Sequence, residues 1–216
     1  MHTKGVARVI AGEAGGRRLA VPDGRDTRPT SDRAREGLFA TISSIAGPLA
    51  GARVLDLYAG SGAVGLEALS RGAAQVLLVE YGARAARVIR QNIEVIGLPG
   101  ATVVADRVER VLARGPAEGR YDVVFADPPY ALADAAVTQV LLLLAEHGWL
   151  AAGALVIVER ATRSGSLSWP DGFVPDRVRR YGEATFWYGR VPEPLGRKSD
   201  DRSGPSPRVL AEEQKG

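Results

Sequence analysis

Cysteine is absent from this sequence of 216 residues, and histidine occurs only twice. The lack of cysteine excludes disulfide bonds, thiolate metal sites and a cysteine nucleophile. Of the two histidines, His147 directly precedes Gly148, which is typical of the end of a helix. A Ser-His-Asp triad and a histidine zinc site are therefore disfavoured, and we expect no metal.

Long apolar runs are also missing. None approaches the roughly 20 residues that span a bilayer. The first residues show no apolar segment followed by a small-residue cleavage site, so no secretory signal is indicated. Hydrophobic residues make up 45% of the chain and charged residues 25%, as in ordinary globular proteins. We expect a cytoplasmic monomer.

Positive charge is modest overall but concentrated near the N-terminus. The net charge is +3 and the pI about 9.4. Residues 1–36 contain five acids and eight basic residues, namely Lys4, Arg8, Arg17, Arg18, Arg25, Arg28, Arg33 and Arg35. Such a patch fits a phosphate-backbone partner, but it fits a solvated charged surface equally well.

Three segments are indicated along the chain. Residues 1–27 form a basic arm whose short apolar stretches around Gly15 and Gly16 favour a β-hairpin. Residues 28–190 form the main domain. Residues 191–216 are rich in proline, glycine, serine and charge, and we expect a disordered tail.

The main domain begins with a helix and continues as an alternation of strands and helices. Thr30 or Ser31 can cap the first helix, whose apolar side carries Leu38, Phe39, Ile42 and Ile45. Continuously apolar strands are predicted at 52–58, 75–80, 101–106, 121–127 and 154–160, with a last strand at 177–191 joining the sheet edge. The helices between them are predicted at 63–72, 83–97, 107–114 and 134–147. This rhythm predicts an α/β fold with a mostly parallel sheet covered by helices on both faces.

A glycine-rich turn follows the first strand of this series. The residues after Asp56 include Gly60, Gly62 and Gly65 in GxGxxG spacing, and Glu80 ends the next strand. Glycines at such a turn let the backbone approach a ligand at the carboxyl ends of the strands, where an acid can bind ribose hydroxyls. The pattern fits both a nicotinamide dinucleotide and S-adenosylmethionine (SAM).

Two acids favour SAM. Asp56 lies four residues before the first glycine, where a carboxylate suits a cationic amino-acid moiety better than a pyrophosphate. Asp106 closes the third strand, in reach of an adenine amino group.

The most specific motif is DPPY, residues 127–130, at the end of another predicted strand. An exocyclic amine on a purine is a poor nucleophile because its lone pair is delocalised into the ring. Acceptors from Asp127 and the Pro128 carbonyl would favour a pyramidal nitrogen, while Pro129 keeps the backbone extended. Tyr130 offers a face on which an extruded base can stack. Without cysteine, methylation of pyrimidine C5 through a thiolate adduct is excluded.

With these motifs, the chain resembles class I SAM-dependent methyltransferases of the RsmD family, which act on guanine N2 in 16S ribosomal RNA. The resemblance covers about residues 5–190. It rests on the stretches IAGEAGGRRLAVP, TRPTSDRAREGLF, VLDLYAGSGAVGLEALSRGA, VE at 79–80, DPPY and YGEATFWYGR. The polar tail after residue 192 departs from the family pattern.

The resemblance implies a Rossmann-like fold with a seven-stranded sheet, SAM as cofactor, and 16S rRNA as partner, within an assembled or assembling small subunit. SAM would be bound by Asp56, Tyr58, Ala59, Gly60, Gly62, Glu80, Asp106 and Arg107. The target base would be held by Asp127, Pro128, Pro129 and Tyr130. RNA would be bound by Arg17, Arg18, Arg28, Arg33 and Arg35.

Three alternatives remain open on the residues alone. DPPY is shared with adenine-N6 methyltransferases acting on RNA or DNA, although no separate DNA-recognition domain fits in this chain. A nicotinamide-dependent oxidoreductase would leave DPPY without a role. A non-enzymatic RNA-binding protein would leave the whole SAM motif without one.

Overall fold

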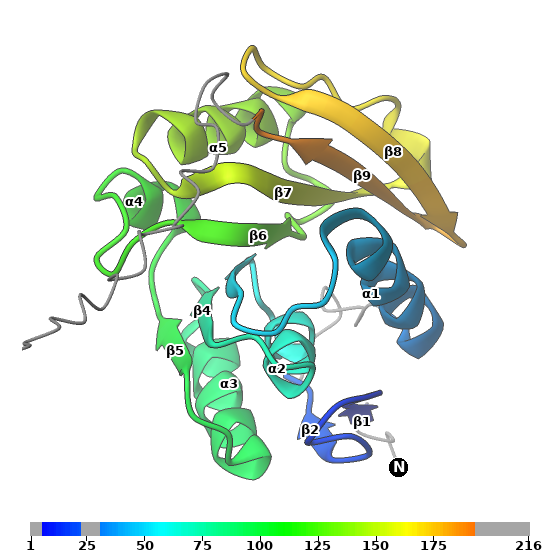
Figure 1. The fold of residues 1–216 in the computed structure, drawn as a ribbon, viewed down its shortest axis with the longest axis vertical. Helices are drawn as coiled ribbons and strands as arrows, with labels where there is room; N and C mark the ends of the chain where they lie inside the picture. Colours follow the sequence, from blue (N-terminus) through cyan, green and yellow to red (C-terminus); the bar gives the residue numbers. More distant parts are fainter. Residues whose placement is uncertain (1–5, 23–30, 193–216) are drawn as a thin grey trace, which may run out of the picture.

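The computed structural model describes residues 6–22 and 31–192. Its main feature is a seven-stranded sheet in the order β5-β4-β3-β6-β7-β9-β8 (Figure 1). The strands are β3 (Arg53–Leu57), β4 (Gln75–Val79), β5 (Ala101–Val104), β6 (Tyr121–Ala126), β7 (Leu150–Ala161), β8 (Val174–Tyr181) and β9 (Ala184–Arg190). The pairs from β5 to β7 are parallel, whereas β9 is antiparallel to both β7 and β8. The predicted fold class, a mostly parallel sheet in a Rossmann-like arrangement, is confirmed.

Helices cover both faces of this sheet and bury two apolar cores. The helices are α1 (Asp32–Ala46), α2 (Ala63–Ser70), α3 (Ala83–Ile96), α4 (Val108–Leu112) and α5 (Asp134–Glu146), with a short 3-10 helix, η1 (Thr162–Ser164). One core joins α1, α2 and α3 to side chains such as Val123 and Phe125 of β6. The other joins α4 and α5 to the alternate residues, such as Val124 and Ala126. Because side chains alternate along a strand, neighbours in the sequence of β6 belong to different cores.

The start of α1 is set by a side-chain cap. The hydroxyl oxygen of Ser31 accepts a hydrogen bond from the Ala34 N–H (3.2 Å), which satisfies one of the free amides of the first turn. Ser31 is therefore the cap, and the other candidate, Thr30, lies outside the described residues. Leu38, Phe39 and Ile42 are buried as predicted.

The last predicted strand is wrong in detail. Residues 177–191 were expected to form one strand at the sheet edge, but the chain turns at Gly182 (φ 62°) and forms the two antiparallel strands β8 and β9. Gly182 and Glu183, in the middle of the predicted strand, are the local signal for this turn. The edge is β8, and β9 lies inside the sheet with Phe186 and Tyr188 fully buried.

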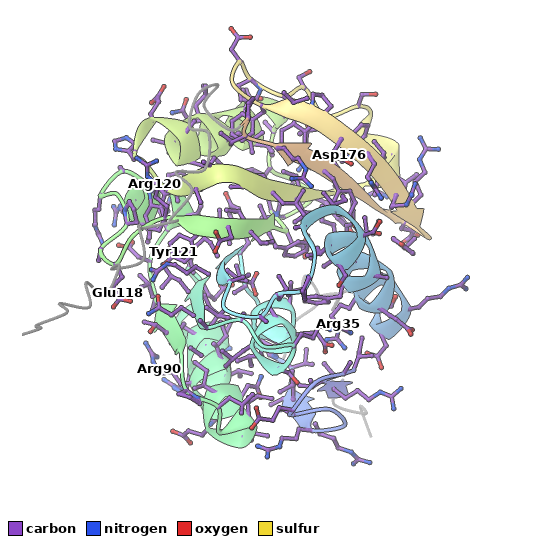
Figure 2. The ribbon with its side chains drawn as sticks, viewed as in Figure 1. Arg35, Arg90, Glu118, Arg120, Tyr121 and Asp176 are labelled. Atoms are coloured by element: carbon purple, nitrogen blue, oxygen red, sulfur yellow. The ribbon has the colours of Figure 1, made fainter. Side chains whose placement is uncertain are left out.

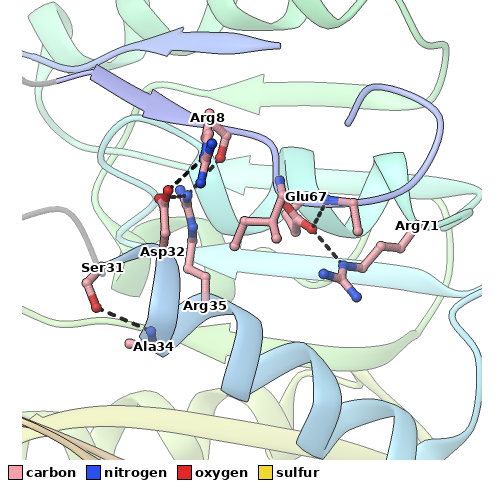
Figure 3. Close-up of polar contacts among 9 residues, drawn as sticks. Arg8, Ser31, Asp32, Ala34, Arg35, Glu67 and Arg71 are labelled. Carbon is pink, nitrogen blue, oxygen red and sulfur yellow. Dashed lines mark hydrogen bonds and ion pairs between the residues drawn. The ribbon is translucent and has the colours of Figure 1, made fainter. Parts of the chain in front are cut away.

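The N-terminal hairpin is confirmed and is anchored on α2 (Figure 3). It consists of β1 (Val6–Arg8) and β2 (Arg18–Ala20). Glu67 of α2 is fully buried, and its carboxylate accepts hydrogen bonds from the N–H groups of Ile10 (2.6 Å) and Ala11 (3.0 Å). Arg71 forms an ion pair with the same carboxylate at 2.7 Å. The arm is therefore packed on the main domain and held by a buried acid.

Two further contacts hold the hairpin close to the domain. Gly12 has a φ of +84°, and a Cβ there would lie 1.8 Å from the carbonyl oxygen of Ser70, so only glycine allows this approach. Asn92 of α3 donates to the carbonyls of Ala20 (2.9 Å) and Ser61 (2.9 Å). Asn92 thus links β2 directly to the glycine-rich turn.

Candidate active site

A cavity of about 580 Å³ lies at the carboxyl edge of the sheet. It opens there because β3, β4 and β6 are parallel, so the loops after all three strands meet at one edge. All residues predicted for catalysis and cofactor binding line it except Gly62 and Asp106. A cavity of this size lies in the usual range for small-molecule sites.

The glycine-rich turn forms one wall of the cavity, and several of its residues have positive φ angles. Tyr58 has a φ of 61°, the one positive value at a non-glycine position among the described residues. Gly60 (φ 56°) and Gly62 (φ 78°) follow, and Gly62 begins α2. Non-glycine residues in this region cost roughly 1–3 kcal/mol and occur often at ligand sites.

Gly65 fits against the first acid of the turn. Its N–H donates to Oδ2 of Asp56 (2.8 Å), and an added Cβ would lie 3.0 Å from the same oxygen. Asp56 is almost fully buried at 1% exposure. Burial raises the pKa of Asp56, the Gly65 hydrogen bond opposes this effect, and the nearby Glu80 adds to it; the resulting pKa is about 7.

Glu80 connects the ends of two loops. Its Oε2 accepts from the Gly60 N–H (2.9 Å) and its Oε1 from the Gly82 N–H (2.6 Å). These bonds fix the carboxylate against the cavity, and each oxygen still has a second lone pair for a ligand hydroxyl.

The DPPY motif lines the same cavity and follows β6, the strand next to β3. The Asp127 N–H donates to the Leu57 carbonyl at 3.3 Å, which extends the pairing of β6 with β3 to the motif. Pro128 is buried, whereas Tyr130 is 42% exposed. The Pro129 carbonyl accepts from the Leu132 N–H (2.8 Å), and within the described part of the chain no N–H donates to the Pro128 carbonyl.

A third acid near the motif was missed by the sequence analysis. In the parallel pair of β6 and β7, Ala126 is opposite Val158, so the next residues, Asp127 and Glu159, follow side by side. Asp56 of β3 lies opposite Phe125 of β6. Phe125 is two residues before Asp127 and so points to the same face as Asp127. Asp56, Asp127 and Glu159 therefore share one face of the sheet. Glu159 is 3% exposed. An acid at the end of the apolar run VIVE was the available signal, the same one that marks Asp127 and Glu80.

The neighbouring acids change the pKa of Asp127. Burial raises the pKa of Asp127 well above its ordinary value, and the neighbouring Glu159 and Asp56 raise it further. The site therefore favours a proton, or a bound cation, near Asp127.

Aromatic and charged side chains complete the cavity. The guanidinium of Arg107 lies 5.0 Å from the ring centroid of Tyr81, which is 65% exposed. The Tyr58 hydroxyl lies 3.3 Å from Oε1 of Glu109, and burial together with Glu109 raises the pKa of Tyr58. Tyr81 and Glu109 were not predicted, although Tyr81 directly follows Glu80, the acid after β4.

Asp106 lies beside the cavity without lining it. Its carboxylate accepts from the Arg107 N–H (2.8 Å) and from Nη2 of Arg114 (2.7 Å), and Arg110 lies 3.9 Å away. The Arg107 N–H, followed by the two arginines, lowers the pKa of Asp106. Its predicted contact with adenine stays a prediction.

The predicted RNA-binding arginines have different environments. Arg17, Arg18 and Arg33 are exposed. Arg17 nevertheless donates to the carbonyls at the end of α3, those of Val95 (2.9 Å) and Ile96. Arg28 lies outside the described residues.

For Arg35 the expectation of a surface position facing RNA is wrong. The side chain is fully buried and donates to the Arg8 carbonyl (2.7 Å) and to Oδ1 of Asp32 (2.6 Å), as Figure 3 shows. It lies on the face of α1 that packs inward, so it joins the hairpin to the helix.

Comparison with known proteins agrees with this architecture. The family model described as conserved hypothetical protein 95 matches residues 7–190. The ribosomal RNA small subunit methyltransferase D of Escherichia coli strain K12 is 35% identical, over 84% of this chain and 88% of that protein. A solved structure of a hypothetical protein from Thermus thermophilus is 36% identical with a TM-score of 0.69, covering 85% of this chain and 98% of that one.

A more distant structure shares the fold alone. A putative methyltransferase named SMU.776, solved as a complex with S-adenosylhomocysteine (SAH), is 16% identical with a TM-score of 0.64, covering 81% of this chain and 53% of that one. Among the described residues, no helix has both the length and the hydropathy to cross a membrane. By the match over residues 7–190 and the identity to the E. coli protein, the chain belongs to the conserved hypothetical protein 95 family, the RsmD family that its motifs indicated.

Proposed function

We propose that the protein transfers a methyl group from SAM to the exocyclic N2 amine of a guanine in 16S rRNA. The observation that carries the proposal is the DPPY motif on the wall of the cavity formed by the glycine-rich turn. The E. coli relative, named for the RNA of the small ribosomal subunit, supports the choice of substrate.

The cavity walls fit a cationic adenosyl cofactor. Glu80, held by the Gly60 and Gly82 amides, offers acceptor lone pairs to ribose hydroxyls. The buried carboxylate of Asp56 suits an ammonium group, whose charge compensates the cost of burying an acid. Arg107 and Tyr81 flank the opening and suit a planar adenine. When bound, SAM would supply an electrophilic methyl group on a sulfonium, and breaking the methyl C–S bond would leave the neutral thioether SAH as product.

On the substrate side, Asp127 orients the attacking amine. Its carboxylate accepts one N2 hydrogen and the Pro128 carbonyl accepts the other, which frees the nitrogen lone pair. Tyr130, exposed at the mouth of the cavity, stacks on the extruded base. Positioning of this kind supplies much of the rate in transfers between two bound groups.

The reaction also releases a proton. After N2 gains the methyl group, it carries an extra proton, which passes to the carboxylate of Asp127. The raised pKa of Asp127 favours this acceptance, because burial, and after it the neighbouring Glu159 and Asp56, make its charged form unfavourable. Bound SAM would bring a positive charge into the cavity that Asp127 lines, which would favour the ionised form of this carboxylate before transfer.

The decisive experiment supplies labelled SAM to naked 16S rRNA and to small subunits that lack the modification, and identifies the product nucleoside by mass spectrometry. We expect N2-methylguanine. N6-methyladenine would replace the proposal by the adenine alternative that shares the DPPY motif. The relative yield from rRNA and subunits would identify the assembly state that serves as substrate.

Asp127→Asn tests the assigned role. We expect methyl transfer to fall by at least about a hundredfold, in line with the loss of a positioned proton acceptor, while SAH still binds. Asp171→Asn, an exposed acid after β7, is the matched control. Normal activity of the Asp127 variant would refute the mechanism.

A further inference from the structure

We propose that Arg179 and Arg180, at the end of the edge strand β8, bind the RNA backbone next to the target guanine. The proposal rests on the proposed function and adds a binding surface to it. Of the N-terminal arginines expected to contact RNA, Arg35 is buried and Arg17 donates to a carbonyl at the end of α3, whereas Arg18 and Arg33 are exposed.

Sheet register places Arg179 in line with the catalytic motif. Asp127, the residue after β6, comes opposite Glu159 of β7 when the β6–β7 register is continued. Glu159 is opposite Phe186 of β9, and Phe186 is opposite Arg179 of β8. Residues in one row across a sheet point to the same face. Arg179 therefore lies on the face that carries Asp56, Asp127 and Glu159.

The distance between Arg179 and Asp127 fits a short stretch of RNA. β8 is three strands from β6, and strands are about 4.8 Å apart, so Arg179 lies roughly 14 Å from Asp127 along the sheet. This distance spans roughly four nucleotides at a rise of about 3.4 Å per nucleotide of one stacked strand. Arg180 is the next residue of β8, and its side chain points to the opposite face of the sheet.

Two positive charges follow each other at this end of β8. Arg179 and Arg180 are exposed, and within residues 6–22 and 31–192 neither forms an ion pair. Their neighbour Arg177 differs, because Asp176 pairs with it at 2.9 Å and also contacts Arg190 at 3.4 Å. One acid, Glu183, lies in the adjoining turn. Two cations at the end of an edge strand, on the same edge as the DPPY motif, fit a polyanion better than an apolar or acidic partner.

The test compares two double variants. Arg179→Ala with Arg180→Ala removes the proposed surface. Arg90→Ala with Arg120→Ala removes the same charge from α3 and from the segment before β6, on the opposite side of the view from β8 in Figure 2. Binding to 16S rRNA and to unmodified small subunits is measured as a function of salt, with SAH binding as a check on the fold.

We expect the β8 pair to weaken RNA binding about tenfold and to lower the salt slope by about two, one for each lost phosphate contact. SAH binding should be unchanged, and the control pair should bind RNA as the wild type does. Equal losses from the two pairs, or none from the β8 pair, would overturn the proposal. Stronger dependence of duplex DNA binding on the β8 pair would overturn the assignment to RNA. RNA binding that needs Arg179 and Arg180, without any methyl transfer, would overturn the proposed function and leave the surface in place.

Discussion

At the scale of single residues, three carboxyl groups on one face of the sheet decide the chemistry of the cavity. Asp56 and Glu159 are almost fully buried, and Asp127 lies between them. Buried charge is costly unless it is compensated. A cationic ligand in this cavity therefore relieves unfavourable electrostatic energy among the three acids.

The pKa of Asp56 gives a prediction for stability against pH. The pKa of Asp56 is about 7 in the folded protein and 3.8 in the unfolded chain. Between pH 3.8 and pH 7 the folded protein therefore binds more protons than the unfolded chain. The free energy of unfolding thus falls as pH rises through this window. Over the whole window Asp56 should account for up to about 4 kcal/mol of that loss, of which roughly 2.5 kcal/mol falls between pH 5 and pH 8. Urea unfolding at pH 5 and pH 8, without cofactor, measures it.

Asp56→Asn is the control for this effect, because it keeps an acceptor for the Gly65 N–H and cannot ionise. The stability difference between pH 5 and pH 8 should be smaller in the variant. An unchanged difference would show that Asp56 does not titrate in this range.

Individual residues also show how far the sequence could be interpreted. Asp127 and Glu80 were predictable because an acid at the end of an apolar strand is a local pattern. The position of Glu159 beside Asp127 depends on the register of β6 and β7, which no local pattern gives. Arg35 resembled a surface cation, but a helix face that meets the hairpin buries it.

At the scale of elements, the N-terminal hairpin depends on one acid of α2. Glu67→Gln keeps the size of the side chain but replaces one acceptor oxygen by an amide that faces a backbone N–H of Ile10 or Ala11. We expect a loss of about 2 kcal/mol in the free energy of unfolding, typical for a buried donor left without a partner. Thermal unfolding should then occur about 4–8 °C lower.

Glu94→Gln on the exposed side of α3 is the matched substitution, with an expected change within about 0.5 kcal/mol. Similar Tm values for the two variants would mean that the hairpin contributes little to global stability.

Elements were predicted best where apolar runs and glycines coincide. The strands around the glycine-rich turn and DPPY were found because each is a short apolar run that ends in a polar residue. The β8–β9 hairpin was missed because Gly182 and Glu183 were not taken as a turn. β7 begins at Leu150, earlier than the apolar run at 154–160 indicates.

At the scale of the whole molecule, cofactor binding should appear as thermal stabilisation. SAH at a hundred times its Kd should stabilise the fold by about 2.7 kcal/mol. For a chain of this size that corresponds to roughly 5–10 °C in Tm. NAD should have no effect, and Glu80→Gln should reduce the shift with SAH. Stabilisation by NAD alone would contradict SAM as the cofactor.

The order of strands in the sheet has a consequence for synthesis of the chain. β3 and β6 are neighbours, but β4 and β5 lie between them in the sequence. Chains generally begin to fold from the N-terminus as they are made. A nascent chain thus completes the cofactor strands β3, β4 and β5 first, and the edge of β3 stays open until β6 brings Asp127 into place.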